Sequence, residues 1–233
     1  MKRKNSEMDF TADEETIHNA FENISVDVLD WFIKKYLDCK DAAVFRCVRK
    51  FARDAVDATG RNLWDELRDE LTERDLQVLR AWRKSCPELR DMWRGDDASH
   101  WKGVTWLDGR VTELHLACMR LSGQLPRLEG LTSLQEVNLC CNQLSAPITE
   151  KLFQGLTSLQ EVRLFRNELS GPIPEKLFEG LTSLQEVYLS ENKLSGPIPE
   201  RLFEGLTSLH SVWLQDNELS GPIPERLRAV VKL

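Results

Sequence analysis

Residues 184–199 read Leu-Gln-Glu-Val-Tyr-Leu-Ser-Glu-Asn-Lys-Leu-Ser-Gly-Pro-Ile-Pro, and close copies of this stretch fill the C-terminal half of the chain. One asparagine marks the same place in each copy, and it recurs every 25 residues at Asn142, Asn167, Asn192 and Asn217. Self-similarity at a fixed period of this size is typical of a solenoid, in which each unit buries its apolar side only against its neighbours. The pattern therefore predicts a repeat array and favours binding over catalysis.

The apolar spacing within one repeat predicts a short strand followed by a turn. Leu184, Val187 and Leu189 follow the spacing L-x-x-L-x-L, and Tyr188 alternates with them toward solvent, which is the period-2 mark of a strand. An inward-facing amide such as that of Asn192 both donates and accepts hydrogen bonds. We expect it to satisfy backbone groups of the turn that would otherwise be buried without partners.

The ending Leu-Ser-Gly-x-Ile-Pro resembles the signature of plant-type leucine-rich repeats, and the similarity covers roughly residues 109–233. Three full copies are present, at 169–174, 194–199 and 219–224. The resemblance implies an α/β fold, a right-handed solenoid whose short parallel strands line a concave face and which is preceded by an all-α region.

About five repeats are expected over residues 112–233, the last of them incomplete. Two units depart from the signature: residues 144–149 read Leu-Ser-Ala-Pro-Ile-Thr, and the first unit has Met119 where the asparagine belongs. After Pro224 the sequence shows no further strand pattern. Either its apolar end, Val230, Val231 and Leu233, folds back as a cap, or the chain is a fragment of a longer array.

Residues 96–111 resemble the N-terminal cap of plant-type leucine-rich repeat proteins, whose pattern is C-x-W-x-G-V-x-C. Trp101 and Gly103 match that pattern, whereas the two cysteine positions hold Ser99 and Trp106. A disulfide at this place is therefore excluded, and we expect the cap to pack on the first coil by hydrophobic contact.

Cysteine usage and the N-terminus predict a reduced, intracellular and cytoplasmic protein rather than a secreted one. The chain begins Met-Lys-Arg-Lys-Asn-Ser-Glu and has no apolar segment of a signal peptide behind these charges. None of the six cysteines falls into a C-x-x-C zinc spacing. They are Cys39, Cys47, Cys86, Cys118, Cys140 and Cys141.

Composition and motifs exclude several function classes. The net charge of −7 and the pI near 5.3 argue against a nucleic-acid partner. No apolar stretch approaches the 18 residues of a membrane span. The four histidines are scattered, and no motif for nucleophilic, metal-dependent or phosphate chemistry occurs. The sequence thus predicts a protein that is not an enzyme and needs no metal or cofactor.

Helical spacing of apolar residues predicts an all-α region over residues 23–95, after a disordered polar tail at 1–22. The later part of this region is expected to hold two helices. Asn62 is a candidate cap for the first, and Thr72 with Asp75 resembles a capping box that begins the second. Pro87 is expected to end that helix.

Part of this region, at about 26–66, resembles the F-box. The matching segments are Asp27-Val-Leu29, Tyr36-Leu-Asp-Cys-Lys-Asp41, Phe45-Arg-Cys-Val48 and Leu63-Trp64. The resemblance implies docking to the adaptor subunit of a cullin-type ubiquitin ligase. The residues it assigns to docking are Val28, Leu29, Phe32, Leu37 and Val48. The alternative is a small helical bundle that only caps the solenoid.

Outward positions on the predicted strands differ between repeats while the framework hardly changes, so the differing residues are not needed for the coil. Arg163, Phe165, Tyr188 and Trp213 form an aromatic and cationic cluster, and Arg, Tyr and Trp predominate at interface hot spots. The recurring columns of Gln and Glu are interpreted as solvating the sheet. The candidate partner-binding residues are His115, Asn138, Arg163, Phe165, Arg166, Tyr188, Glu191, Trp213, Gln215 and Asp216.

These observations predict a non-catalytic interaction module that binds a protein or peptide through the concave face of its repeats. Two alternatives remain: an F-box-type substrate adaptor of a ubiquitin ligase, and a fragment of a receptor-like ectodomain. The missing signal peptide and the missing cap cysteines count against the receptor-like alternative.

Overall fold

The computed structural model describes residues 63–228 and 231–232 of the 233-residue chain. Residues 71–233 form one compact unit, and the boundary falls between Glu70 and Leu71. The predicted boundary between the helical region and the repeat cap, after residue 95, stays a prediction. The five residues assigned to adaptor docking lie outside the described part of the chain, so the F-box resemblance stays a prediction.

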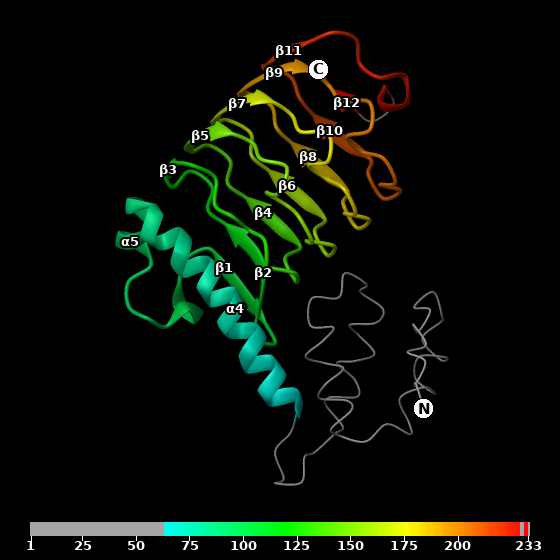
Figure 1. The fold of residues 1–233 in the computed structure, drawn as a ribbon. Helices are drawn as coiled ribbons and strands as arrows, with labels where there is room; N and C mark the ends of the chain where they lie inside the picture. Colours follow the sequence, from blue (N-terminus) through cyan, green and yellow to red (C-terminus); the bar gives the residue numbers. More distant parts are fainter. Residues whose placement is uncertain (1–62, 229–230, 233) are drawn as a thin grey trace, which may run out of the picture. The chain divides into compact units, whose positions relative to one another are not determined.

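A long sheet of short strands runs through the repeats in the order β1-β2-β4-β6-β8-β10-β12 (Figure 1). All neighbouring strands are parallel except β1, which is antiparallel to β2. This arrangement confirms the predicted solenoid. The strands are β1 Val104–Leu107, β2 Arg110–His115, β4 Glu136–Asn138, β6 Glu161–Arg163, β8 Glu186–Tyr188, β10 Ser211–Trp213 and β12 Val231–Lys232.

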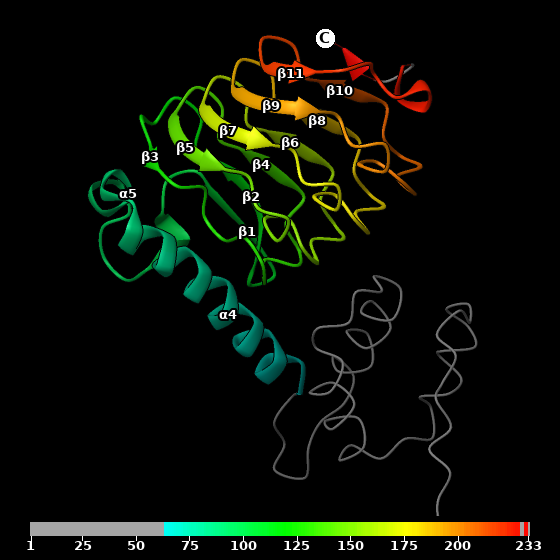
Figure 2. The ribbon, with the colours of Figure 1, turned by 45° about the horizontal axis from the view of Figure 1, so that its top comes forward.

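A second parallel sheet is formed by the Leu-Ser-Gly-Pro segments, in the order β11-β9-β7-β5-β3 (Figure 2). The sequence indicated only an extended path here. The segments pair because each repeat carries the same extended backbone at the same level, as in the pairing of Ser195 with Glu218. The strands are β3 Ser122–Gly123, β5 Gln143–Pro147, β7 Glu168–Pro172, β9 Lys193–Pro197 and β11 Glu218–Ser220.

The core between the two sheets consists of the repeated Leu, Val, Ile and Phe positions. Phe153, Phe178 and Phe203 come from successive repeats and stack with ring centroids 5.7 and 5.3 Å apart. Residues of this kind contribute roughly 1.5–3 kcal/mol each when fully buried. Since every repeat presents the same apolar positions, the core continues unbroken along the array.

The recurring asparagines form a ladder of buried hydrogen bonds. The Asn192 amide donates to the carbonyl oxygens of Leu164, Leu189 and Ser190 at 3.0–3.1 Å. Its Oδ1 accepts from the backbone N–H of Leu169 at 3.0 Å. Each asparagine thus joins its own turn to the preceding repeat, and Asn142, Asn167 and Asn217 make the corresponding bonds.

The residue before each asparagine has a left-handed backbone although none is glycine. The φ angles in this column lie between 54° and 57°. In the first repeat the residue is Cys118, which precedes Met119 in place of an asparagine. The other members are Cys141, Arg166, Glu191 and Asp216. Such a conformation costs a non-glycine residue about 1–2 kcal/mol. The bonds of the asparagine ladder offset that cost by fixing the turn on both sides.

Helix α4 spans Leu63–Ser85 without a break, so the prediction that a new helix begins at Thr72 is wrong. Neither Thr72 nor Asp75 caps a helix end. Thr72 Oγ1 donates to the Gly109 carbonyl at 2.7 Å, and the Asp75 carboxylate accepts two bonds from Arg110 at 3.0 Å each. The capping-box pattern therefore reports a tertiary contact between the helix and the first hairpin of the solenoid.

Tryptophans join the helices to the first coil, as the sequence led us to expect for Trp101. Trp93, which follows helix α5 (Pro87–Met92), stacks on Trp101 with centroids 4.9 Å apart. Trp82 of α4 meets Trp93 edge-on at 5.7 Å. A Cβ at Gly103 would lie 2.3 Å from the His115 carbonyl oxygen, so only glycine fits there. These contacts replace the disulfide that Ser99 and Trp106 exclude.

At the C-terminal end, Val231–Lys232 form β12 and pair in parallel with β10. Val231 is buried. The expectation that no further strand follows Pro224 is therefore wrong: two residues complete another rung of the long sheet, because Val231 occupies the position next to Val212. Val230 and Leu233, the other members of the expected cap, lie outside the described residues.

Replacing Asn192 with Ala is expected to lower the free energy of unfolding by about 3 kcal/mol. The change leaves buried carbonyls and the Leu169 N–H without partners, and each such group costs about 1–3 kcal/mol. Chemical denaturation of the full chain measures the effect. Asn217→Ala is the matched control and should cost less, since Asn217 is only partly buried. Equal losses would contradict the role of burial.

Replacing Asp75 with Ala is expected to destabilise the cap by about 3–5 kcal/mol, because it leaves the Arg110 guanidinium buried without its counter-charge. Glu73→Ala, on the same helix, removes an exposed ion pair with Arg80 and should change stability by at most about 1 kcal/mol. Thermal unfolding of both variants distinguishes them. A stable Asp75→Ala protein would refute the anchoring of α4 by this pair.

Candidate functional site

The outward face of the long sheet, called here the concave face, presents two columns of side chains. In one column the paired positions are Glu113, Glu136, Glu161, Glu186 and Ser211. In the other they are His115, Asn138, Arg163, Tyr188 and Trp213. Leucines and valines between them face the core. The strands thus hold a column of four glutamates, which ends in Ser211, beside a varied column.

The structure brings the predicted aromatic and cationic residues into one ridge. Tyr188 stacks on Trp213 with centroids 6.0 Å apart and meets Phe165 edge-on at 6.5 Å. The Arg163 guanidinium lies 5.8 Å from the centre of the Tyr188 ring. We name Arg163, Phe165, Tyr188 and Trp213 the aromatic ridge.

Trp213 is half-buried rather than exposed, which corrects the expectation from sequence. The indole packs on Tyr188, and its Nε1 donates to Ser211 Oγ at 2.8 Å. These contacts hold the ring in place before any partner arrives. A fixed aromatic side chain loses little conformational freedom when it binds, which favours its use as an anchor.

The acidic column, interpreted from sequence as solvating the sheet, makes contacts with side chains of the varied column. Glu113, Glu136, Glu161 and Glu186 form a row across neighbouring strands, which we name the glutamate row. Parallel strands lie about 4.8 Å apart, so these like charges repel one another. In the sequence, the row is visible only as a glutamate that recurs from repeat to repeat. Such recurrence is equally consistent with a role in the repeat framework.

Side chains of the varied column neutralise part of the glutamate row. Arg163 makes an ion pair with Glu161, and Tyr188 donates its hydroxyl to Glu186. His115 Nε2 lies 3.2 Å from Glu113 and 3.6 Å from Glu136. In addition, His210 Nε2 lies 3.5 Å from Glu186. The row has only one permanent cation among these partners, so it keeps an excess of negative charge.

The environment of the row shifts two pKa values upward. The hydrogen bond to Glu186 raises the pKa of Tyr188 to about 12, with burial and the nearby carboxylates acting in the same direction. Burial raises the pKa of the Glu161 carboxyl above its usual range, and the neighbouring glutamates add to the rise while Arg163 opposes it. Both shifts favour the protonated forms of these two groups.

The remaining candidate residues lie beside the ridge or along the rim. Arg166 and Glu191, in the left-handed column, make an exposed ion pair at 2.7 Å between neighbouring repeats. Asp216 is exposed in the same column, and Gln215 is half-buried next to it. At the other end, Asn138 Oδ1 accepts from the Cys140 N–H at 3.3 Å.

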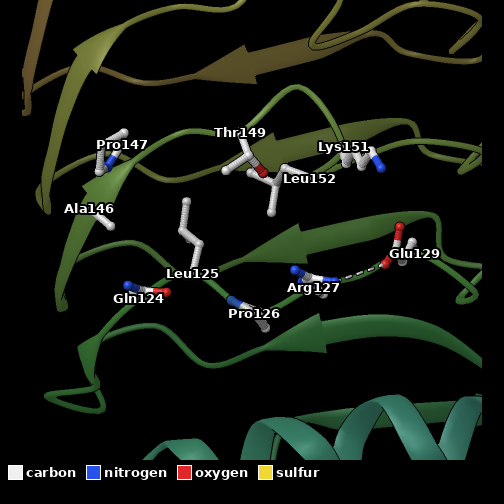
Figure 3. Close-up of a pocket in the computed structure, with 10 residues that line it drawn as sticks. All are labelled: Gln124, Leu125, Pro126, Arg127, Glu129, Ala146, Pro147, Thr149, Lys151 and Leu152. Carbon is white, nitrogen blue, oxygen red and sulfur yellow. Dashed lines mark ion pairs between the residues drawn. The ribbon is translucent and has the colours of Figure 1, made fainter.

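A separate hollow lies where the first repeat is two residues shorter than the others (Figure 3). Its volume of about 260 Å³ is below the range of roughly 300–1,000 Å³ typical of ligand pockets. It is therefore a weaker candidate than the concave face. Its walls consist of Gln124, Leu125, Pro126, Arg127, Glu129, Ala146, Pro147, Thr149, Lys151 and Leu152.

Within residues 63–228 and 231–232, no group of three or more His, Cys, Asp or Glu side chains is placed to hold a metal ion. Among the helices that the structure describes, none has the length and apolar character needed to cross a bilayer.

Comparison with known proteins relates the chain to plant repeat proteins. The Leucine Rich Repeat family matches residues 183–204. No curated protein sequence matches the chain. Among solved structures, the BIR2 ectodomain from Arabidopsis thaliana is 34% identical with a TM-score of 0.55. That match covers 64% of this chain and 83% of the ectodomain.

Two further structures show partners bound to similar repeats. The ectodomain of the Arabidopsis receptor kinase HAESA, in complex with an IDA peptide hormone, is 29% identical with a TM-score of 0.61. The match covers 70% of this chain but 28% of HAESA. The BIR3–SERK2 complex from Arabidopsis thaliana is 29% identical with a TM-score of 0.53, covering 70% of this chain and 92% of that one.

Tyr188 is expected to ionise near pH 12, and Glu186→Gln should lower its pKa toward 10 by removing the charged acceptor. Because the folded pKa is raised, the stabilisation from this contact is complete below pH 10 and is lost as the pH rises toward 12. Absorbance of the phenolate reports the ionisation in a Tyr36→Phe background, since the chain has two tyrosines. An unchanged pKa in Glu186→Gln would contradict the assigned cause.

Proposed function

Because the chain is a plant-type leucine-rich repeat protein, we propose that it binds a protein or peptide segment on its concave face, with the aromatic ridge as the anchor. The observation that carries the proposal is the stack of Tyr188 and Trp213 beside the Arg163 guanidinium. Buried aromatic and arginine side chains contribute most of the binding energy at interfaces. The solved relatives that hold a peptide hormone or a co-receptor add support.

The partner segment carries basic and apolar groups. The glutamate row beside the ridge attracts lysine or arginine, and the chain as a whole has a net charge of −7. The ridge offers flat aromatic surface to an apolar or guanidinium side chain. Charge complementarity of this kind orients the partner and speeds its association, and it weakens as salt is added.

Two predictions from sequence are not tested by the structure. Docking to a ubiquitin-ligase adaptor through residues 26–66 stays a prediction from sequence, as does the intracellular, cytoplasmic location. The alternative of a receptor-like ectodomain fragment gains support from the likeness to plant receptor ectodomains. Ser99 and Trp106, in place of the cap cysteines, count against it. The absence of catalysis likewise remains a prediction.

The proposal predicts that peptides selected from a random display library on the full chain will depend on the ridge. Tyr188→Ala should weaken their binding about 30-fold, since truncating an interface hot spot costs about 2 kcal/mol or more. Glu179→Ala, an exposed change outside the long sheet, is the matched control and should leave binding unchanged. Titration of the labelled peptides measures both affinities.

Selected peptides should also be rich in Lys or Arg, and adding salt should weaken their binding to the protein. Replacing Glu136 with Gln is expected to reduce their affinity because it removes one charge of the glutamate row. Peptides that bind Tyr188→Ala as tightly as the unchanged protein would overturn the concave face as the binding site. A preference for acidic peptides would overturn the stated partner chemistry.

A further inference from the structure

Three free cysteines gather at the rim of the concave face, at the N-terminal end of the array. They are Cys118, Cys140 and Cys141. Cys118 N donates to the Cys140 carbonyl at 2.9 Å, and Leu116 N donates to the Asn138 carbonyl at 2.8 Å. In a parallel ladder this pattern continues the register of β2 and β4, which places Cys118 directly opposite Cys141.

The expected Cα separation of the pair falls within the range of disulfide-bonded cysteines. Neighbouring strands lie about 4.8 Å apart, and the Cα atoms of disulfide-bonded cysteines lie about 4.4–6.8 Å apart. Both residues have the same left-handed backbone, with φ of 57° for Cys118 and 56° for Cys141, so their Cβ atoms leave the chain in the same direction. Their side chains are close enough to interact, and the Cys141 side chain raises the pKa of the Cys118 thiol.

The third cysteine differs from the pair in its surroundings. Cys118 is exposed and Cys141 is partly exposed, whereas Cys140 is buried. Burial, with the neighbouring thiols, raises the pKa of Cys140 to about 11, so it is almost entirely protonated at neutral pH.

We propose that Cys118 and Cys141 are a disulfide-forming pair that links the first two repeats in the presence of a small-molecule disulfide such as oxidised glutathione. The Cys118 thiolate attacks one sulfur of oxidised glutathione and displaces one glutathione thiolate. The Cys141 thiolate then attacks the Cys118 sulfur and displaces the second. The two thiol protons end on the two released glutathione molecules.

Strain makes this bridge readily reducible. Two residues related by a simple shift between parallel strands keep their Cβ atoms about 4.8 Å apart, whereas a disulfide requires about 3.5–4.5 Å. The turns must therefore approach each other when the bond forms. Strained and exposed disulfides have higher reduction potentials than structural ones, so excess reduced glutathione should reopen the bond.

The test is to incubate the native full chain with oxidised glutathione, block free thiols, digest with trypsin and map disulfides by mass spectrometry. Cleavage at Arg110, Arg120, Arg127 and Lys151 separates residues 111–120, which hold Cys118, from residues 128–151, which hold Cys140 and Cys141. We expect these peptides to be joined within one monomer, with the loss of two hydrogen atoms. The link should persist in Cys140→Ala and disappear in Cys141→Ser.

Three outcomes would overturn the proposal. A link that persists in Cys141→Ser would assign the bridge to Cys140. Glutathione retained on Cys118 as a mixed disulfide, without a link, would show that Cys141 cannot reach it. A link found only between two copies of the chain would place the reaction between molecules. Circular dichroism of each variant distinguishes these results from loss of fold.

Discussion

The hydrogen bonds of the buried asparagines are the constraint on which the rest of the structure depends. Asn192, for example, joins three carbonyl groups and one N–H across two neighbouring repeats. The bonds hold a strained left-handed turn at the end of every strand. With the turns fixed, the strands stay in register, and outward side chains of successive repeats stand directly opposite one another.

Register explains both candidate features of the surface. It gathers single residues from different repeats into the aromatic ridge, whose members Phe165, Tyr188 and Trp213 are at least 23 residues apart. It also lines up the repeated glutamates into a charged row. The same alignment places Cys118 against Cys141. A surface of this kind changes partner by substitution in the columns while the buried framework stays intact.

Much of the solenoid was predictable because its contacts are local and repeated. The L-x-x-L-x-L spacing located the strands, and the asparagine period located the turns that the ladder fills. The ridge residues were also found, since Tyr188 and Trp213 stand out against an unchanging background. What the sequence did not show was that Trp213 is already packed, because that depends on its neighbour Tyr188 in the preceding repeat.

Contacts between distant or identical segments escaped prediction for physical reasons. The pattern Thr72-x-x-Asp75 has the same appearance as a capping box, although its partners are Gly109 and Arg110. The second sheet depends on pairing between repeats, as in Ser195 with Glu218, which no single repeat reveals. The role of the glutamate row stays a prediction, because recurrence has the same appearance whether a column serves the framework or a partner.

Photo-crosslinking is the measurement that tests the central claim most directly. A peptide selected on the full chain would carry a photoreactive group, and its adducts would be mapped by mass spectrometry. Binding on the concave face predicts adducts at the aromatic ridge, on Arg163, Tyr188 or Trp213. Adducts confined to the second sheet, for example at β9 Lys193–Pro197, would contradict the account by placing the partner on another surface of the solenoid.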